Sequence, residues 1–150
     1  MAKNVEPGLH KIPVCYETAF APDLSEAAVS LGLSTEALIN IHIENAYRVY
    51  LIGFLPGFLY LGSLPANLQL KRKSTPALIK KGSVAMAGWQ TGIYPADSPG
   101  GWHCIGRTPI RLFDTEQQPP FPWKAGDVIQ FVRISENRFS EIEKTGQWDF

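Results

Sequence analysis

Four side chains of this sequence are suited to binding a small polar molecule: one amide, two guanidinium groups and one imidazole. Gln90 presents a donor and an acceptor on one amide edge, the complement of a lactam or ureido group, although a glutamine that braces the backbone looks the same. Arg72, inside the basic run at residues 71–73, and Arg107 could each hold a carboxylate or phosphate through two parallel hydrogen bonds. For Arg72 a solvated basic loop is the alternative. His42 falls on the apolar face of an expected helix, where a hydrogen-bonded core histidine is more common than a catalyst.

A second group of candidates lies in the glycine-rich segment that leads to Trp102. Ser98, Pro99, Gly100 and Gly101 have the composition of a type II turn, with Gly100 in the left-handed position. Gly101 has no side chain to block its amide, so successive N–H groups here could form a nest for an anion. Most glycine turns bind nothing, and that interpretation stays open.

Residues 53–62 form an apolar segment that carries three aromatic side chains between glycines, namely Phe54, Phe58 and Tyr60. These rings either fold back into their own core or form a rim that closes over a ligand or a partner protein. We expect the proline-glycine bends near Phe58 and Trp102 to meet at one mouth of the fold, with both rings at that rim.

Composition and charge exclude several classes of function. The chain has 14 basic and 14 acidic side chains, so no general field favours a nucleic acid or an anionic membrane. No apolar leader is recognisable at the start, and the longest apolar stretch is too short to span a bilayer, which predicts a cytoplasmic protein. The two cysteines have no metal-ligand spacing, and we expect no metal site. Signatures of serine hydrolases, zinc proteases, phosphate-binding loops and dinucleotide folds are missing from the sequence, which disfavours an enzyme that is active alone.

The elements that must position these residues are mainly β. Thirteen glycines and twelve prolines punctuate short apolar runs, as turns do between strands. Asp23 and Ser34 are expected to cap helices at residues 24–31 and 35–43, and a third short helix is expected at residues 135–144. Strands are expected at residues 12–16, 46–52, 83–87, 92–94, 102–106, 109–113 and 128–134. This pattern predicts one closed β-barrel, over residues 1–150, with two or three short helices that plug or flank it.

An ordered series of motifs then identifies a family. These motifs are Gly53-Phe54-Leu55-Pro56-Gly57-Phe58, Tyr60-Leu61-Gly62, Gly82-Ser83-Val84, Gln90-Thr91-Gly92-Ile93-Tyr94-Pro95, Ser98-Pro99-Gly100-Gly101-Trp102 and Ile105-Gly106-Arg107-Thr108-Pro109. Through them the chain, from about residue 12 to residue 142, resembles the KipI/PxpB family, which supplies the B-type component of 5-oxoprolinase and is also known as allophanate hydrolase subunit 1.

The resemblance implies a cyclophilin-like barrel, which agrees with the barrel expected from the turns. It also implies that the small α+β domain that precedes the barrel in family members is absent from this sequence. One departure concerns Ala77, which follows Pro76 where the family usually has arginine. Any anion-binding role of that arginine is therefore in doubt, and Arg72 is its nearest substitute.

The resemblance further implies a subunit that is inactive alone and works in a heteromeric, ATP-dependent 5-oxoprolinase. Its partners would be a second cyclophilin-like subunit of the KipA/PxpC type and a third subunit of the PxpA type, and ATP would be bound elsewhere in the complex. On this hypothesis Gln90 and Ser98 meet the lactam, Arg107 or Arg72 the carboxylate, and His42 lies near the reacting carbonyl, with Tyr94, Gly100 and Gly101 in the same site. The alternatives are a KipI-like inhibitor of a sporulation histidine kinase and the carboxyltransferase part of a urea carboxylase or allophanate hydrolase system.

Overall fold

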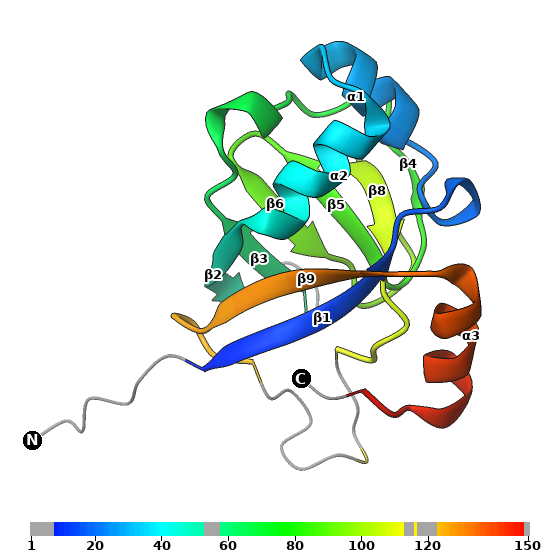
Figure 1. Cartoon of the computed structure of the whole chain (residues 1–150). Coiled ribbons are helices and arrows are strands. Elements are labelled where there is room, and N and C mark those ends of the chain that lie inside the picture. Colours follow the sequence, from blue (N-terminus) through cyan, green and yellow to red (C-terminus); the bar gives the residue numbers. More distant parts are fainter. Residues whose placement is uncertain (1–7, 53–57, 113–115, 117–122, 149–150) are drawn as a thin grey trace, which may run out of the picture.

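Seven strands close into one barrel in the computed structural model, which describes residues 8–52, 58–112, 116 and 123–148 (Figure 1). Their order around the barrel is β1-β8-β5-β6-β3-β2-β9, and β4 and β7 form a separate two-stranded ribbon. The strands are β1 Leu9–Cys15, β2 Ala46–Ile52, β3 Leu59–Gly62, β4 Ala77–Ile79, β5 Ser83–Ala87, β6 Gln90–Ile93, β7 Ser98–Gly100, β8 His103–Arg107 and β9 Val128–Ile134. The helices are α1 Leu24–Leu31, α2 Thr35–Glu44 and α3 Glu136–Thr145, with short 3₁₀ turns at Thr18–Phe20 and Ala66–Leu68. The predicted closed barrel with three short helices is confirmed.

The barrel closes through the parallel pairing of its first and last strands. β1 and β9 stay in register from Leu9 opposite Val128 to Cys15 opposite Ile134, and Figure 1 shows them side by side across the front. The other ladders in the barrel are antiparallel. Residues 8–15 are therefore held by residues far away in sequence.

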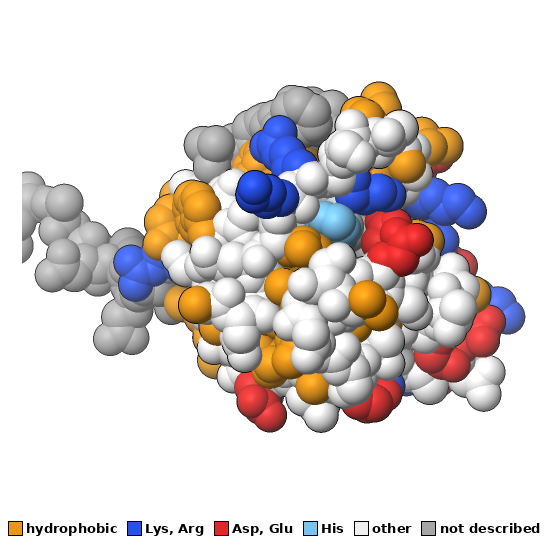
Figure 2. All heavy atoms as spheres, turned by 90° about the horizontal axis from the view of Figure 1, so that it is seen from above, with side chains coloured by type: hydrophobic (Ala, Val, Ile, Leu, Met, Phe, Trp, Pro, Cys, Tyr) orange, Lys and Arg blue, Asp and Glu red, His pale blue; other side chains and the backbone are white. Residues whose placement is uncertain are grey.

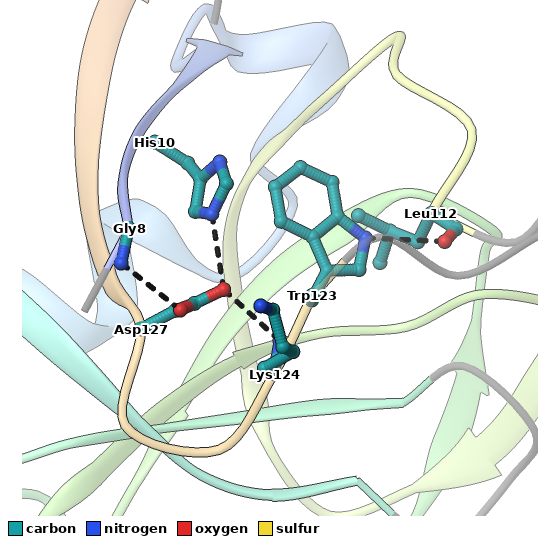
Figure 3. Close-up of polar contacts among 6 residues, drawn as sticks. All are labelled: Gly8, His10, Leu112, Trp123, Lys124 and Asp127. Carbon is teal, nitrogen blue, oxygen red and sulfur yellow. Dashed lines mark hydrogen bonds and ion pairs between the residues drawn. The ribbon is translucent and has the colours of Figure 1, made fainter. Parts of the chain in front are cut away.

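A buried carboxylate fastens this closure at one end (Figure 3). Asp127 accepts hydrogen bonds from the backbone N–H groups of Gly8 and Lys124, at 3.1 and 3.0 Å, and its other contact is with His10 Nε2 at 3.0 Å. Burial acts to raise the pKa of Asp127, but these hydrogen bonds outweigh it and the net shift is downward. Residues 124–127 form a tight turn before β9, in which the N–H of Asp127 donates to the Lys124 carbonyl at 3.0 Å and Gly126 has a φ of 92°.

Two hydrophobic clusters lie on the two faces of the same barrel wall. Leu59, Leu61, Val84, Met86 and Ile93 point inward, and they pack with helices α1 and α2 in the main core. Side chains alternate along a strand, so the intervening residues of β3 and β5 point outward. A second cluster forms there, on the outer wall, from Phe58, Ile79, Ala85, Ala87, Tyr94 and Trp102.

The helix ends follow the sequence with one exception. Ser34 and Ser135 accept hydrogen bonds from the N–H groups of Ala37 and Arg138, as N-caps do. Gly32 ends α1 in the left-handed conformation, at a φ of 69°. Asp23 does not cap α1 through its side chain, because its carboxylate turns away toward β8.

Three sequence predictions are corrected. Residues 98–101 do not form a type II turn: Ser98–Gly100 is strand β7, paired with β4, and Gly100 does not have the positive φ that the turn needs. Strand β3 lies where only an aromatic loop was expected. Residues 109–112, expected to be part of a strand, are not one. The proline-glycine bend expected before Phe58 and the Phe54 side chain lie outside the described residues.

Within the described ranges, no helix is long and apolar enough to cross a membrane. The same residues contain no group of three or more His, Cys, Asp or Glu side chains that could hold a metal ion.

Candidate functional site

Four aromatic rings converge on the outer wall of the barrel around a small pocket. Phe58 lies at the centre: its ring centroid is 4.3 Å from that of Tyr60, 4.8 Å from that of Tyr94 and 5.7 Å from that of Trp102. The pocket measures about 110 Å³, and we call it the aromatic pocket. Its lining residues are Phe58, Tyr60, Arg72, Tyr94, Pro99, Gly100, Gly101 and Trp102.

Strand pairing brings these rings together. In the β3–β6 ladder Leu59 lies opposite Ile93 and Tyr60 opposite Gly92, which places Phe58 next to Tyr94. Gly92 leaves room for the rings, since a Cβ there would lie 3.1 Å from the Trp102 ring and 3.2 Å from the Phe58 ring. The predicted convergence of the segments near Phe58 and Trp102 is confirmed. Its predicted place is wrong: the rings cover the outer wall and not the mouth, because residues of β3 alternate between the two faces.

Arg72 is the exposed cation of this pocket, and hydrogen bonds hold the segment that carries it. The N–H of Lys73 donates to the Gly101 carbonyl at 2.7 Å, and His103 Nε2 donates to the Lys71 carbonyl at 2.7 Å. These bonds fix the backbone of the segment against the strand that begins at His103, while the side chain of Arg72 itself is exposed to solvent.

Both tyrosines of the pocket keep their protons at neutral pH. Burial raises the pKa of Tyr60, an effect that the positive charge of Arg72 partly offsets. Burial, together with the Tyr60 side chain, raises the pKa of Tyr94 to about 12, again against an opposing effect of Arg72. Each hydroxyl is thus a hydrogen-bond donor, and with the guanidinium of Arg72 the pocket presents donors suited to a carboxylate or carbonyl oxygen.

The size of the aromatic pocket decides what it can do alone. Ligand sites are typically about 300 to 1,000 Å³, and this pocket is about 110 Å³. It has room for a group the size of one small ring.

The other predicted site residues lie elsewhere. Gln90 starts β6 on the same outer face, two residues and about 7 Å along the strand from Gly92, and it does not line the aromatic pocket. Ser98 is buried in β7, where its hydroxyl donates to the Pro99 carbonyl. No anion nest forms at residues 98–101, because β7 is extended there.

His42 is a core residue with no exposed surface. Its Nδ1 lies 2.7 Å from the Tyr16 hydroxyl and its Nε2 lies 3.0 Å from Thr91 Oγ1. Thr91 donates its own proton to the Ala85 carbonyl, so it must accept from His42, and Nδ1 in turn accepts from Tyr16. No ring nitrogen of His42 is left to reach a substrate, and the imidazole is structural.

Arg107 lies in a second hollow, which we call the cationic pocket. It measures about 280 Å³ and lies between the β4–β7 ribbon, the start of α1 and the outer faces of β5 and β8. Its polar lining residues are Asp23, Lys73, Lys80, Ser83, Cys104 and Arg107, and its apolar ones are Ala19, Phe20, Pro22, Ala77, Leu78 and Ile79. Ala77 thus lines a pocket whose positive charge comes from other residues.

Sequence reasoning missed the ion pair in this pocket. Lys73 Nζ lies 3.1 Å from one oxygen of Asp23, and the other oxygen accepts from the N–H of Cys104 at 2.8 Å. These residues are 50 and 81 positions apart, so no local pattern could have connected them. Figure 2, which views the molecule from the α1 end, shows several basic side chains across the upper half of this face, with an acidic group among them next to a histidine.

The geometry defines a closed-barrel domain with two candidate binding pockets on its outer wall. Comparison with known proteins extends this. Residues 1–123 match the family described as carboxyltransferase domain, subdomain C and D. The chain is 48% identical over 130 residues to the B component of the 5-oxoprolinase of Bacillus subtilis, covering 86% of this chain and 54% of that protein. It is 46% identical over 123 residues to the same component of the Haemophilus influenzae 5-oxoprolinase, covering 81% and 58%.

Solved structures agree with this assignment. The crystal structure of a conserved uncharacterized protein from Pyrococcus horikoshii has a TM-score of 0.83 at 44% identity, covering 87% of this chain and 61% of that one. The urea amidolyase of K. lactis shares the fold, with a TM-score of 0.70 at 17% identity over 93% of this chain and 10% of that one. The chain therefore belongs to the carboxyltransferase-domain family, subdomains C and D, and the predicted KipI/PxpB membership is confirmed. It spans about half the length of the curated relatives that it matches.

Proposed function

We propose that this chain is a domain of a heteromeric, ATP-dependent 5-oxoprolinase, and that its aromatic pocket supplies half of the site where 5-oxoproline is opened to glutamate. One observation carries this proposal: the aromatic rings, Arg72 and the backbone of Gly100 and Gly101 meet in a hollow of about 110 Å³ on the barrel's outer wall, well below the usual size of a complete ligand site. The 5-oxoprolinase components among its relatives support the choice of reaction.

The chemistry of 5-oxoproline matches the lining of this pocket. Its carboxylate would pair with the Arg72 guanidinium through charge-assisted hydrogen bonds, and the apolar part of its ring would pack on Phe58 and Trp102. The protonated hydroxyls of Tyr60 and Tyr94 would donate to substrate oxygens. This half of the site binds and orients, and the second cyclophilin-like subunit would bring the groups that complete it.

The aromatic pocket is smaller than a nucleotide, and the sequence has no phosphate-binding loop. We therefore assign ATP to another subunit of the complex. The lactam needs activation because amide resonance stabilises it, and ATP hydrolysis would supply that activation there.

Reconstitution tests this proposal directly. The chain is mixed with subunits of the KipA/PxpC and PxpA types, and ATP-dependent release of glutamate from 5-oxoproline is measured. Arg72→Ala should lower kcat/KM about 10- to 100-fold, the value of a charge-assisted carboxylate contact. Lys71→Ala, a neighbouring exposed side chain outside the pocket, is the matched control and should leave kcat/KM unchanged. Full turnover by the partners without this chain, or equal rates for the two variants, would contradict the proposal.

Carboxyl transfer from biotin is the second candidate, and the description of the matching family favours it. Binding of a biotinylated carrier protein to the chain, lost in Trp102→Ala but kept in Trp89→Ala, would support this candidate over 5-oxoproline opening. Trp89 is a fair control because it is exposed and lies outside the aromatic pocket.

A further inference from the structure

We propose that the cationic pocket is a second binding site, for a small carboxylate with a short apolar body, distinct from the aromatic pocket. The proposal does not depend on the 5-oxoprolinase reaction. It rests on the volume of this pocket, on the charge that its lining residues leave uncompensated, and on its apolar wall.

Volume separates the two pockets. The cationic pocket, at about 280 Å³, is more than twice the size of the aromatic pocket and approaches the lower end of typical ligand sites, about 300 Å³. The β4–β7 ribbon divides them: Pro99 and Gly100 of β7 line the aromatic pocket, and Ala77 to Ile79 of β4 line the cationic one. A ligand can therefore occupy this pocket by itself.

The charges of the lining residues do not balance. Lys73, Lys80 and Arg107 face one carboxylate, that of Asp23, and Asp23 is already committed to Lys73 and to the N–H of Cys104. Arg107 donates through Nε to the Lys81 carbonyl at 3.0 Å, which leaves the two terminal nitrogens of the guanidinium without a hydrogen-bond partner among the described residues. An anion is the ligand that such a lining attracts, and a planar fork of two N–H groups matches a carboxylate.

Two of the three cations, Arg107 and Lys73, are held in place before any ligand arrives. The guanidinium carbon of Arg107 lies 5.8 Å from the centre of the Phe139 ring, and Phe139 in turn packs on Phe20 of the pocket wall, at 4.7 Å between ring centroids. Lys73 is fixed by its ion pair with Asp23, and the two side chains are only 24% and 14% exposed. Ordering these groups costs a ligand little, because the fold has ordered them already.

The apolar lining residues favour a ligand with an apolar body. Phe20, Pro22 and Ile79 line the pocket, and Leu78, also in the lining, is 69% exposed, so most of its aliphatic surface is available for a ligand to cover. Removing that surface from water adds a favourable hydrophobic contribution to binding. A ligand with a carboxylate at one end and a few carbon atoms at the other would pair with Arg107 and cover Leu78 at the same time.

Nuclear magnetic resonance titration of the chain with butyrate tests the proposal. Butyrate should cause saturable shifts of the Arg107 Nε–Hε signal and of the backbone signals of residues 77–80. Butyramide, which has the same shape without the charge, should bind at least about tenfold more weakly. The same factor is expected for Arg107→Gln, whereas Arg111→Gln, an exposed arginine outside the pocket, should bind as the unaltered chain does.

A substitution of Leu78 tests the contribution of the apolar wall to binding. Leu78→Ser should weaken butyrate binding severalfold without affecting the fold, because the side chain is mostly exposed. Val29→Ser, at an equally exposed aliphatic residue on α1, is the matched control and should change nothing. Equal binding of butyrate and butyramide, tighter binding of inorganic phosphate than of butyrate, no saturable shift, or shifts that disappear only in Arg72→Gln would each overturn the proposal.

Discussion

Acid should destabilise this protein through one buried imidazole. His42 has no exposed surface, and both ring nitrogens are engaged: Nδ1 accepts from the Tyr16 hydroxyl and Nε2 donates to Thr91. A second proton on Nδ1 would break the bond from Tyr16 and place a charge in the core. Burial accordingly lowers the pKa of His42 from 6.5 to about 3.

The sign and size of the effect follow from proton linkage. Between pH 6.5 and about 3 the unfolded chain binds a proton at this histidine and the folded chain does not, so the free energy of unfolding falls as the pH falls. The slope approaches about 1.4 kcal/mol per pH unit for one proton, which amounts to a loss of about 2 to 3 kcal/mol between pH 6 and pH 4. That loss is a large part of the roughly 5 to 15 kcal/mol that typically stabilises a domain of this kind.

Urea unfolding at a series of pH values measures this contribution. His42→Gln keeps a donor and an acceptor but cannot titrate in this range. Between pH 6 and pH 4 its free energy of unfolding should therefore fall by about 2 to 3 kcal/mol less than that of the unaltered chain. His103→Gln, at the outer end of β8, is the matched control and should retain the steeper fall. Identical slopes for His42→Gln and the unaltered chain, or a His42 resonance that titrates near its ordinary pKa, would refute the argument.

Two further predictions concern the buried carboxylate of Asp127 and the close approach of Gly100 to Tyr94. Asp127→Asn should lower the free energy of unfolding by about 1 to 3 kcal/mol, because the carboxylate that joins Gly8, Lys124 and His10 loses its charge. The pKa of Asp127 is lowered on folding, so the difference in stability from the unaltered chain should shrink as the pH falls through the folded-state pKa. A difference in urea unfolding that does not depend on pH would contradict this. Gly100→Ala should abolish function of the aromatic pocket in the reconstituted assay, since a Cβ there would lie 2.5 Å from the Tyr94 hydroxyl oxygen, and normal turnover would show that this pocket is not used.

The barrel could be predicted because much of its sequence obeys local rules. Residues 83–87 and 128–134 are apolar runs of strand length between turn residues, the second rich in β-branched side chains, and both are strands with the predicted bounds. Ser34 and Ser135 mark helix starts as their type suggests. Ser98–Gly100 is an exception. Proline followed by glycine is typical of a turn, but pairing with β4 holds these residues extended. A two-stranded ribbon tolerates the missing N–H of Pro99.

Tertiary packing decided the rest of the site. The motifs indicated that Phe58, Tyr60, Tyr94 and Trp102 act together, and they do pack against one another. Which face of the barrel they cover depends on the register of β3, and a shift of one residue would have turned Phe58 and Tyr60 into the core in place of Leu59 and Leu61. The register of β3 could not be predicted from the sequence, because Phe58 and Tyr60 on one face and Leu59 and Leu61 on the other are all apolar, and either pair could fill a core.

The basic run at residues 71–73 shows why the sequence alone could not distinguish the two pockets. Consecutive side chains of an extended segment point to opposite sides. Arg72 therefore lines the aromatic pocket while Lys73 turns to the other side of the ribbon and pairs with Asp23. A hydrogen bond from the Lys73 N–H to the Gly101 carbonyl fixes this alternation, because it ties the run to the residue that follows β7. In the sequence the two residues look like one patch of charge, but in the fold they line two different pockets.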